Sequence, residues 1–185
     1  MIFDYGGPEP HHALANLRLS QRKPSEAVQS AEEAFRRLQL CEPPPEHEFR
    51  VSLAKILMEC SAVDEGCSHK ALEVLSGLMQ EDDENVEVWY LMGVAFNGLQ
   101  SPDYESARDH LKRAAEMLAK IRRAQEEAGD EFTFEDQVQM VEDQLKVAAH
   151  DAEHDMKGEE GNLKEAKALG TADSIGDKAT EMDCG

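Results

Sequence analysis

The sequence predicts an all-α protein in which helical hairpins stack into a short solenoid. Its 185 residues contain only 12 Gly and 7 Pro, and aromatic residues make up 5%, a composition typical of helical proteins. Apolar residues return every three or four positions through most of the chain, which is the period of an amphipathic helix. A set of spaced apolar residues also recurs 36 positions later, and such self-similarity indicates a repeat architecture.

The repeat is clearest between residues 53 and 114. Its two copies share non-polar residues at six positions, which are Leu53, Leu57, Cys60, Ala71, Leu75 and Leu78 in the first copy and Trp89, Gly93, Phe96, Ala107, Leu111 and Ala114 in the second. The second copy resembles the tetratricopeptide pattern of Trp, Leu, Gly and Tyr followed by Ala, Phe and Ala. Its connection, residues 97–106, is two residues longer than the usual repeat of about 34 residues implies. The resemblance implies a tetratricopeptide-like helical-hairpin solenoid.

The first helix of the second copy carries its apolar side chains on one face. Trp89, Met92, Gly93 and Phe96 are spaced i, i+3, i+4 and i+7, which is one stripe of an α-helix. Gly93 and, in the next helix, Ala107 are small, so we expect the two backbones to approach closely there. Trp89 is expected to lie in the core between the paired helices.

The second helix of this copy is expected to begin at Ser101–Pro102 and to end at Gly129. Ser suits the N-cap and Pro the first turn, and Gly is a common residue at a helix end. Thr133 followed by Asp136 then resembles a capping box. The apolar stripe of the next helix, which we expect to cap the solenoid, consists of Phe134, Val138, Val141, Leu145 and Ala148.

A weaker helix pair is expected before the first copy, as a degenerate first repeat. The apolar stripes of its two helices are Ala13, Leu14, Leu17 and Leu19, and then Ala27, Ala31, Ala34 and Leu38. The second helix begins at Pro24–Ser25, and three consecutive prolines at 43–45 mark the loop after it.

The end of the chain has a different composition. From about residue 151 aromatic residues are absent and large aliphatic residues are rare, so this part cannot bury enough apolar surface to offset the entropy of ordering it. We therefore expect a tetratricopeptide-like helical repeat domain over residues 1–154 and a disordered acidic tail over residues 155–185.

The formal net charge of −20 limits the kinds of partner. Such a surface repels phosphates and anionic lipids, so we expect no direct nucleic-acid partner and no membrane partner, and a basic protein segment is the natural counterpart. Alternatively, the acidity only keeps a chaperone-like surface soluble. The four cysteines, Cys41, Cys60, Cys67 and Cys184, form no C-x-x-C pair and are expected to be free thiols. Without a signal peptide at the start, the predicted location is the cytoplasm and nucleus.

Catalysis has no positive indication in the sequence. No phosphate-binding loop, dinucleotide fingerprint, nucleophile elbow or H-E-x-x-H motif occurs, and we expect no enzyme and no cofactor. His150 and His154 lie four residues apart, but no carboxylate or thiol completes a metal motif around them. We therefore expect no metal, and a metal-dependent hydrolase is the rejected alternative.

Two acidic concentrations are candidate partner-binding sites. The first is Glu81, Asp82, Asp83 and Glu84, followed by Glu87 on the next helix. It is interpreted either as part of a clamp for Lys and Arg, or as a solvated turn whose charge suits a helix N-terminus. The second includes Glu135, Asp136, Glu142 and Asp143, together with Glu126, Glu127, Asp130 and Glu131. It is interpreted either as a site for a basic partner or as a solvated face.

The tetratricopeptide resemblance implies a concave groove lined by the first helix of each repeat. In this chain Glu87, Tyr90, Val94 and Asn97 would then line the groove. Tyr90 offers rigid contact area and Asn97 an amide for a peptide backbone. The alternative is that these are ordinary exposed positions of a helix.

The stretch Ala71–Gly93 carries a more specific resemblance. Its acidic joint followed by Val-Glu-Val-Trp-Tyr-Leu is similar to the assembly chaperones of ribosomal protein four of the large subunit, as are Leu17–Pro24 and the acidic ending. This resemblance implies an acidic superhelical groove that binds and shields a basic extension of a newly made ribosomal protein during ribosome biogenesis. The chain is short for this family, which leaves open an N-terminal repeat outside it.

Two other binding functions remain as alternatives. One is a generic tetratricopeptide scaffold for protein-protein interaction. The other is a heat-shock co-chaperone, whose groove needs Lys, Arg and Asn at positions where this chain has Tyr90 and Val94.

Overall fold

The computed structural model describes the backbone of residues 6–170 and the side chains of residues 6–152. Within residues 6–170 the chain is all-helical, without a strand, which confirms the predicted class. The helices are α1 (Glu9–Ser20), α2 (Pro24–Leu38), α3 (His47–Cys60), α4 (Gly66–Glu81), α5 (Val86–Asn97), α6 (Tyr104–Ala128) and α7 (Glu135–Gly170). None of the helices in this part of the chain is both long and apolar enough to cross a membrane.

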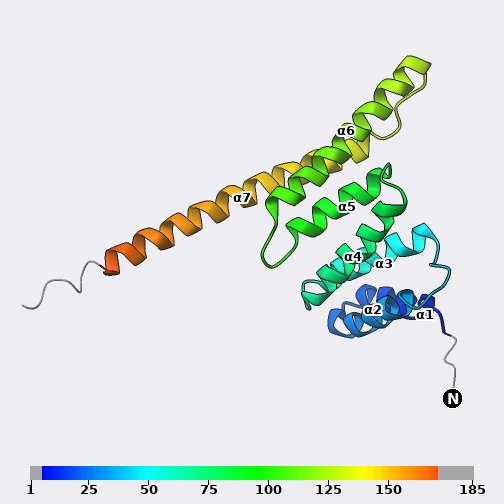
Figure 1. Cartoon of the computed structure of the whole chain (residues 1–185), viewed down its shortest axis with the longest axis horizontal. Helices are drawn as coiled ribbons and strands as arrows, with labels where there is room; N and C mark the ends of the chain where they lie inside the picture. Colours follow the sequence, from blue (N-terminus) through cyan, green and yellow to red (C-terminus); the bar gives the residue numbers. More distant parts are fainter. Residues whose placement is uncertain (1–5, 171–185) are drawn as a thin grey trace, which may run out of the picture. The chain divides into compact units, whose positions relative to one another are not determined.

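The helices pack as consecutive pairs, α1 with α2, α3 with α4, and α5 with α6 (Figure 1). Neighbouring pairs contact each other as well, through α2 with α3 and through α4 with α5. The three pairs belong to one compact unit, residues 1–148. This arrangement is the predicted helical-hairpin solenoid, because each pair buries its apolar faces against the pair beside it.

The repeated apolar positions form the core. The six positions of the first copy, Leu53, Leu57, Cys60, Ala71, Leu75 and Leu78, are all fully buried. In the second copy Gly93, Ala107, Leu111 and Ala114 are buried, whereas Trp89 and Phe96 are half-buried. The repeat in the sequence therefore corresponds to a repeat in packing.

Helices α5 and α6 approach each other closely at Gly93. A Cβ atom at this position would lie 2.5 Å from Cγ of Leu111 and 3.0 Å from the carbonyl oxygen of Ala107. Non-bonded carbon atoms pack at about 3.5–4.0 Å, so only glycine fits. The close approach predicted at Gly93 and Ala107 is confirmed.

The ends of α6 agree only in part with the prediction. The N-cap is Asp103 and not Ser101, and the Asp103 carboxylate accepts a hydrogen bond from the backbone N–H of Ser106 at 2.9 Å. A carboxylate caps as well as a hydroxyl does, so the helix begins after Pro102 instead of with it. Gly129 ends α6 as predicted, with a left-handed φ of 78°.

The apolar stripe predicted for α1 is wrong at Ala13, Leu14 and Leu17 and correct at Leu19, which packs against the core. Ala15 is fully buried, whereas Leu14 and Leu17 are 39% and 50% exposed. His12 instead faces α3, with Nε2 at 2.8 Å from Oγ of Ser52. A small alanine and a hydrogen-bonded histidine therefore fill the buried face of α1. The sequence predicted leucines at this face because they are the more hydrophobic residues.

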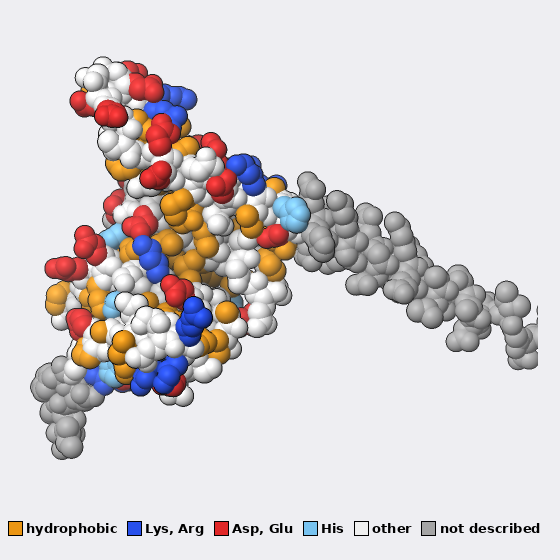
Figure 2. All heavy atoms as spheres, turned by 180° about the vertical axis from the view of Figure 1, so that it is seen from behind, with side chains coloured by type: hydrophobic (Ala, Val, Ile, Leu, Met, Phe, Trp, Pro, Cys, Tyr) orange, Lys and Arg blue, Asp and Glu red, His pale blue; other side chains and the backbone are white. Residues whose placement is uncertain are grey.

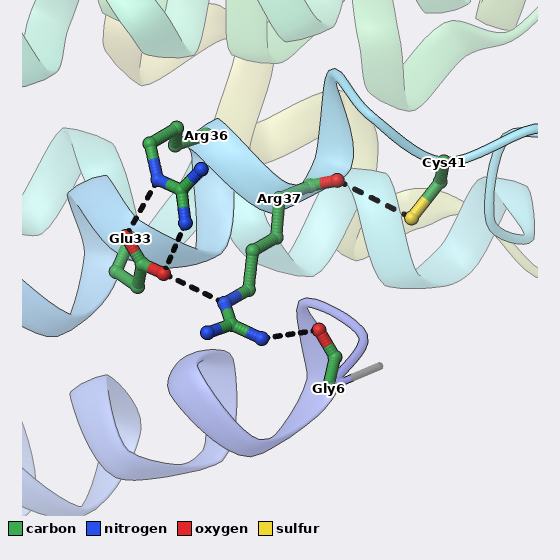
Figure 3. A network of polar contacts seen from close by, with 5 residues as sticks. All are labelled: Gly6, Glu33, Arg36, Arg37 and Cys41. Atoms are coloured by element: carbon green, nitrogen blue, oxygen red, sulfur yellow. Dashed lines mark hydrogen bonds and ion pairs between the residues drawn. The ribbon is translucent and has the colours of Figure 1, made fainter. Parts of the chain in front are cut away.

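A network of ion pairs and hydrogen bonds connects α2 to Gly6, three residues before α1 begins (Figure 3). Glu33 accepts hydrogen bonds from Nε of Arg36 at 2.8 Å and Nε of Arg37 at 2.7 Å, and Arg37 also donates to the carbonyl oxygen of Gly6. The bonds from Arg36 and then Arg37 lower the pKa of Glu33 to about 2. Because the pKa is depressed in the folded state, this network stabilises the fold at neutral pH and loses its effect as the pH falls from 4.5 towards about 2.

Helix α7 covers the last helix pair. It begins at Glu135, two residues after the predicted cap at Thr133. Its residue Val141 is buried and packs with Ala114 and Leu118 of α6. The predicted capping helix is therefore confirmed, since α7 covers the apolar face that α6 would otherwise expose.

A second unit begins at residue 149. Helix α7 continues as far as Gly170, and Ala, Glu and Lys, which favour helix by their own propensity, are frequent there. The domain boundary at residue 154 and the disordered acidic tail over residues 155–185 stay predictions. Residues 171–185 of the predicted tail lie outside the described residues.

Candidate functional site

Three cavities follow one side of the first compact unit and meet at α3 and α5. A cavity of about 400 Å³ lies between α3, α4 and α5, one of about 310 Å³ between α3, α5 and α7, and another of about 310 Å³ between α3 and α5. We call this surface, lined by Lys55, Glu87, Tyr90, Leu91 and Met140, the inner groove. On the face drawn in Figure 2, hydrophobic side chains gather in a hollow with charged side chains beside it.

The part of the inner groove beside α7 has an apolar lining. Tyr90 and Leu91 of α5 face Met140 and Val141 of α7 across the cavity of about 310 Å³. Met140 is 52% exposed although it is apolar. Burial raises the pKa of Tyr90 above its ordinary value, so its hydroxyl stays neutral at physiological pH. This part of the groove can therefore bury an apolar side chain of a partner.

One ion pair crosses the middle of the inner groove. Nζ of Lys55 on α3 lies 2.6 Å from Oε1 of Glu87 on α5. Lys55 lines all three cavities and Glu87 lines two of them. The predicted groove residue Glu87 therefore lies in the groove, but its charge is already partnered by a lysine of the neighbouring repeat.

The acidic joint, residues 81–85, connects α4 to α5 beside the groove. Its first residue, Glu81, forms two hydrogen bonds of 2.6 Å with the guanidinium of Arg50 on α3. These bonds lower the pKa of Glu81, and the bond with Glu81 raises the pKa of Arg50. The Arg50 side chain is only 11% exposed, so this pair is a link between helices.

The rest of the acidic joint is more open. Asp82, Asp83 and Glu84 are exposed, and none of the three forms an ion pair among the described side chains. Asn85 caps α5, and its Nδ2 lies 3.3 Å from Nε2 of His47, a residue that lines the inner cavity between α3 and α5. The joint therefore borders the inner groove at its α3 end.

Trp89 connects the acidic joint to α6. Its Nε1 donates a hydrogen bond of 2.7 Å to the carbonyl oxygen of Asp83, and its ring lies 5.2 Å from the ring of His110. The guanidinium of Arg113 lies 5.9 Å above the indole. The expected core position of Trp89 is confirmed in part: the side chain packs against the core of α6 and α7, but it stays partly exposed.

Replacing Trp89 by Ala is expected to lower the free energy of unfolding by about 3 kcal/mol, at the low end for a large aromatic residue because the side chain is half-exposed. Urea unfolding, monitored by circular dichroism, measures this change in the free energy of unfolding. Trp89→Phe is the control, since it keeps an aromatic ring at this position and loses the hydrogen bond, worth about 1 kcal/mol, together with part of the ring area. A change below 1 kcal/mol for the alanine variant would contradict the packing role.

The acidic residues at the start of α7 lie away from the groove lining. Oε2 of Glu135 lies 2.5 Å from Nη2 of Arg122, and the guanidinium of Arg122 also stacks 4.4 Å from the ring of Phe132. Glu135 therefore closes the connection between α6 and α7. Asp136 beside it is exposed and forms no ion pair among the described side chains.

The other two predicted acidic residues of α7, Glu142 and Asp143, have different neighbours. Glu142 borders a cavity of about 400 Å³ between α6 and α7, which Arg122 and Arg123 also line. Asp143 accepts hydrogen bonds of 2.9 Å from both Gln139 and Lys146, and these bonds lower its pKa, the one from Lys146 first. Glu142 thus has the basic neighbours Arg122 and Arg123 of α6 on the same cavity, whereas the basic partner of Asp143 is Lys146, three residues further along α7.

The predicted groove residues of α5 divide into two groups. Glu87, Tyr90 and Val94 line the inner groove. Asn97, the last residue of α5, is half-buried, and its Oδ1 has no hydrogen-bond partner in the described part of the chain. A partner-binding role for each of these residues, and for those of the acidic joint and α7, stays a prediction.

Sequence reasoning missed Lys55, Gln137 and Met140, which the fold brings into the groove. The sequence did contain a signal for Met140: it is a large apolar residue directly before Val141, but it does not belong to the buried apolar stripe of α7. Lys55 gave no such signal, since a single lysine on an amphipathic helix is ordinary. Within the described side chains no group of three His, Cys, Asp or Glu is placed to hold a metal ion.

Comparison with known proteins adds one relative. No protein-family model matches the sequence. The chain is 30% identical over 177 residues to a curated protein of Emericella nidulans named "Probable assembly chaperone of rpl4". The match covers 89% of this chain and 44% of that protein, so the chain spans less than half of the relative's length.

Proposed function

We propose that this chain is a dedicated assembly chaperone, which binds and shields a basic segment of a newly made large-subunit ribosomal protein during ribosome biogenesis. The observation that carries the proposal is the similarity, along 89% of this chain, to a protein named as a probable assembly chaperone of rpl4. Shielding requires no reaction, so the proposed role is non-enzymatic. The proposed location is the cytoplasm and nucleus, where such a segment is made and delivered.

The inner groove is the proposed binding surface. Its apolar lining around Tyr90 and Met140 offers area to bury, and the open acidic joint lies beside it. A net charge of −20 attracts a basic segment before contact, over about a Debye length of 8 Å at physiological salt. Charge then serves mainly the rate of association, and apolar contact the lifetime of the complex.

Only some of the acidic side chains are open to a client. Glu81, Glu87 and Glu135 each hold an internal cation at 2.5–2.6 Å. Asp83 and Glu84 of the joint are exposed and form no ion pair among the described side chains. We therefore assign the first attraction of the client to Asp83 and Glu84, because these charges can be neutralised without breaking a link of the fold.

The variant Asp83→Lys/Glu84→Lys is expected to associate on the order of threefold to tenfold more slowly with a Lys/Arg-rich segment of the ribosomal protein at low salt. Stopped-flow fluorescence measures the association rate at several salt concentrations. The difference from the unchanged chain should shrink as salt rises towards 1 M, where the Debye length is about 3 Å.

The matched control is Glu105→Lys/Asp109→Lys, which changes the net charge equally at exposed positions of α6. Its association rate should fall much less, because α6 does not line the inner groove. If both variants slow association equally, the attraction comes from the net charge of the chain and not from Asp83 and Glu84. If the unchanged chain binds the segment no better than a scrambled peptide of equal charge, the chaperone proposal is wrong.

A further inference from the structure

The Lys55–Glu87 ion pair differs from the other ion pairs between repeats in its surroundings. Both of its side chains are about half exposed, at 47% and 51%, and Lys55 borders all three cavities. In the Lys70–Glu32 pair, by comparison, Nζ and Oε1 lie 2.7 Å apart, but neither residue lines the groove cavities. Water reaches the Lys55–Glu87 pair and little free energy holds it, so a cation entering the groove can compete for Glu87.

The structure also provides a second acceptor for Lys55. Glu59 lies one helical turn further along α3, at the i+4 spacing that brings two side chains together. Lys55 and Glu59 line the same cavity of about 400 Å³. If Lys55 leaves Glu87, it can pair with Glu59, so the released ammonium group has an acceptor again.

The apolar part of the groove lies directly beside Glu87. Val86, Tyr90, Leu91 and Met140 surround the cavity of about 310 Å³ that Glu87 also lines. This volume is at the lower end of ligand pockets, which suits a single aliphatic or aromatic side chain. A client side chain buried here has Glu87 at its edge, within reach of the neighbouring residue.

We propose that the inner groove takes an apolar side chain of the client together with an adjacent Lys or Arg, and that this cation replaces Lys55 on Glu87 while Lys55 moves to Glu59. The proposal rests on the function proposed above and names the subsite and the sequence chemistry that it selects. Charge complementarity commits the site to a basic segment, because Glu59 and Glu87 line the groove together with Lys55 as its cation. Lys55 then makes binding selective for strongly basic client segments, since a weakly basic segment cannot displace it from Glu87.

The test uses titration calorimetry to measure the affinity of a synthetic Lys/Arg-rich peptide containing Leu-Arg for single and double variants of the full chain. Removing the internal competitor with Lys55→Met should tighten binding up to about fivefold, the range of an exposed ion pair. Glu87→Gln should weaken binding, and in that background Lys55→Met should no longer tighten it. Glu59→Gln should weaken binding because the released Lys55 has no acceptor.

The matched control is Lys70→Met, which makes the same charge change in the pair that does not line the groove. It should leave the affinity unchanged, and circular dichroism melts should show that all variants fold. A second peptide with Ser in place of Leu has equal charge and should bind on the order of tenfold more weakly, since it buries no apolar side chain.

The outcomes separate this inference from the proposed function. If Lys55→Met and Lys70→Met have the same effect, or the Leu and Ser peptides bind equally while the ribosomal segment still binds, the exchange at Glu87 is wrong and the chaperone role stands. If the unchanged chain binds neither the ribosomal segment nor the peptides better than scrambled ones, the proposed function fails.

Discussion

Replacing Leu111 by Ala is expected to lower the free energy of unfolding by about 2–5 kcal/mol, because Leu111 is fully buried and its removal leaves a cavity between α5 and α6. Replacing Gly93 by Ala should also destabilise, by about 1–3 kcal/mol, since the added Cβ would lie 2.5 Å from Cγ of Leu111. The two changes concern the same space, so their effects should not add. Urea unfolding of both single variants and the double variant measures the coupling.

The double variant Gly93→Ala/Leu111→Ala is expected to be more stable than the sum of the single effects predicts. The methyl group at position 93 then meets space that Leu111 has vacated, and only the carbonyl oxygen of Ala107 at 3.0 Å still crowds it. Gly77→Ala is the matched control, because nothing lies within 4 Å of a Cβ there, and the better helix propensity of alanine should stabilise by up to about 1 kcal/mol. Strict additivity would show that positions 93 and 111 do not share this contact.

Raising the pH from about 8 to about 11 is expected to lower the stability of the fold strongly through two buried thiols. Burial, followed by the neighbouring charges, raises the pKa of Cys60 to about 12 and that of Cys67 to about 11, from an ordinary value of 9.0. The unfolded chain releases these protons above pH 9 while the folded chain keeps them. Their contribution is therefore complete below pH 9 and is lost as the pH rises towards 12.

The size of this effect follows from the shifts. One pKa unit corresponds to about 1.4 kcal/mol, so the raised pKa of Cys60, part of which comes from the neighbouring Cys67, corresponds to a loss on the order of a few kcal/mol between pH 9 and 12. Urea unfolding at several pH values measures the slope. The variant Cys60→Ala/Cys67→Ala is the control, and its stability should fall much less steeply with pH because the two thiols are gone. The slope should not reach zero, because the pKa values of Lys70 and Tyr90 are also raised in the folded chain. An unchanged slope would mean that the two thiols ionise freely in the folded chain.

The parts of the fold that could be predicted are those in which one residue type fits one position. Gly93 and Leu111 recur in a pattern whose spacing already specifies two helices in close contact, and their burial follows. At α1 the same reasoning failed, because Leu17 is apolar but exposed and Ala15 is small but buried. Hydrophobicity measures what a side chain gains from burial, whereas the neighbouring helix decides which face is covered.

The site was less predictable than the fold for a related reason. Tyr90 and Glu87 could be placed in the groove because they lie on the helix with the clearest repeat pattern. Whether an acidic residue is open or paired depends on cations far away in the sequence, as with Glu81 and Arg50, which are 31 residues apart. Charge runs in a sequence therefore overstate the charge that a partner meets.

The position of Trp89 makes it an optical probe of the acidic joint. The chain contains one tryptophan, so its intrinsic fluorescence comes from a single indole whose N–H is bound to the carbonyl oxygen of Asp83. When a ligand straightens or shields the joint, the polarity around this indole changes and its emission wavelength shifts. Occupancy beside Asp83 and Glu84 can thus be followed in real time without attaching a dye to the protein.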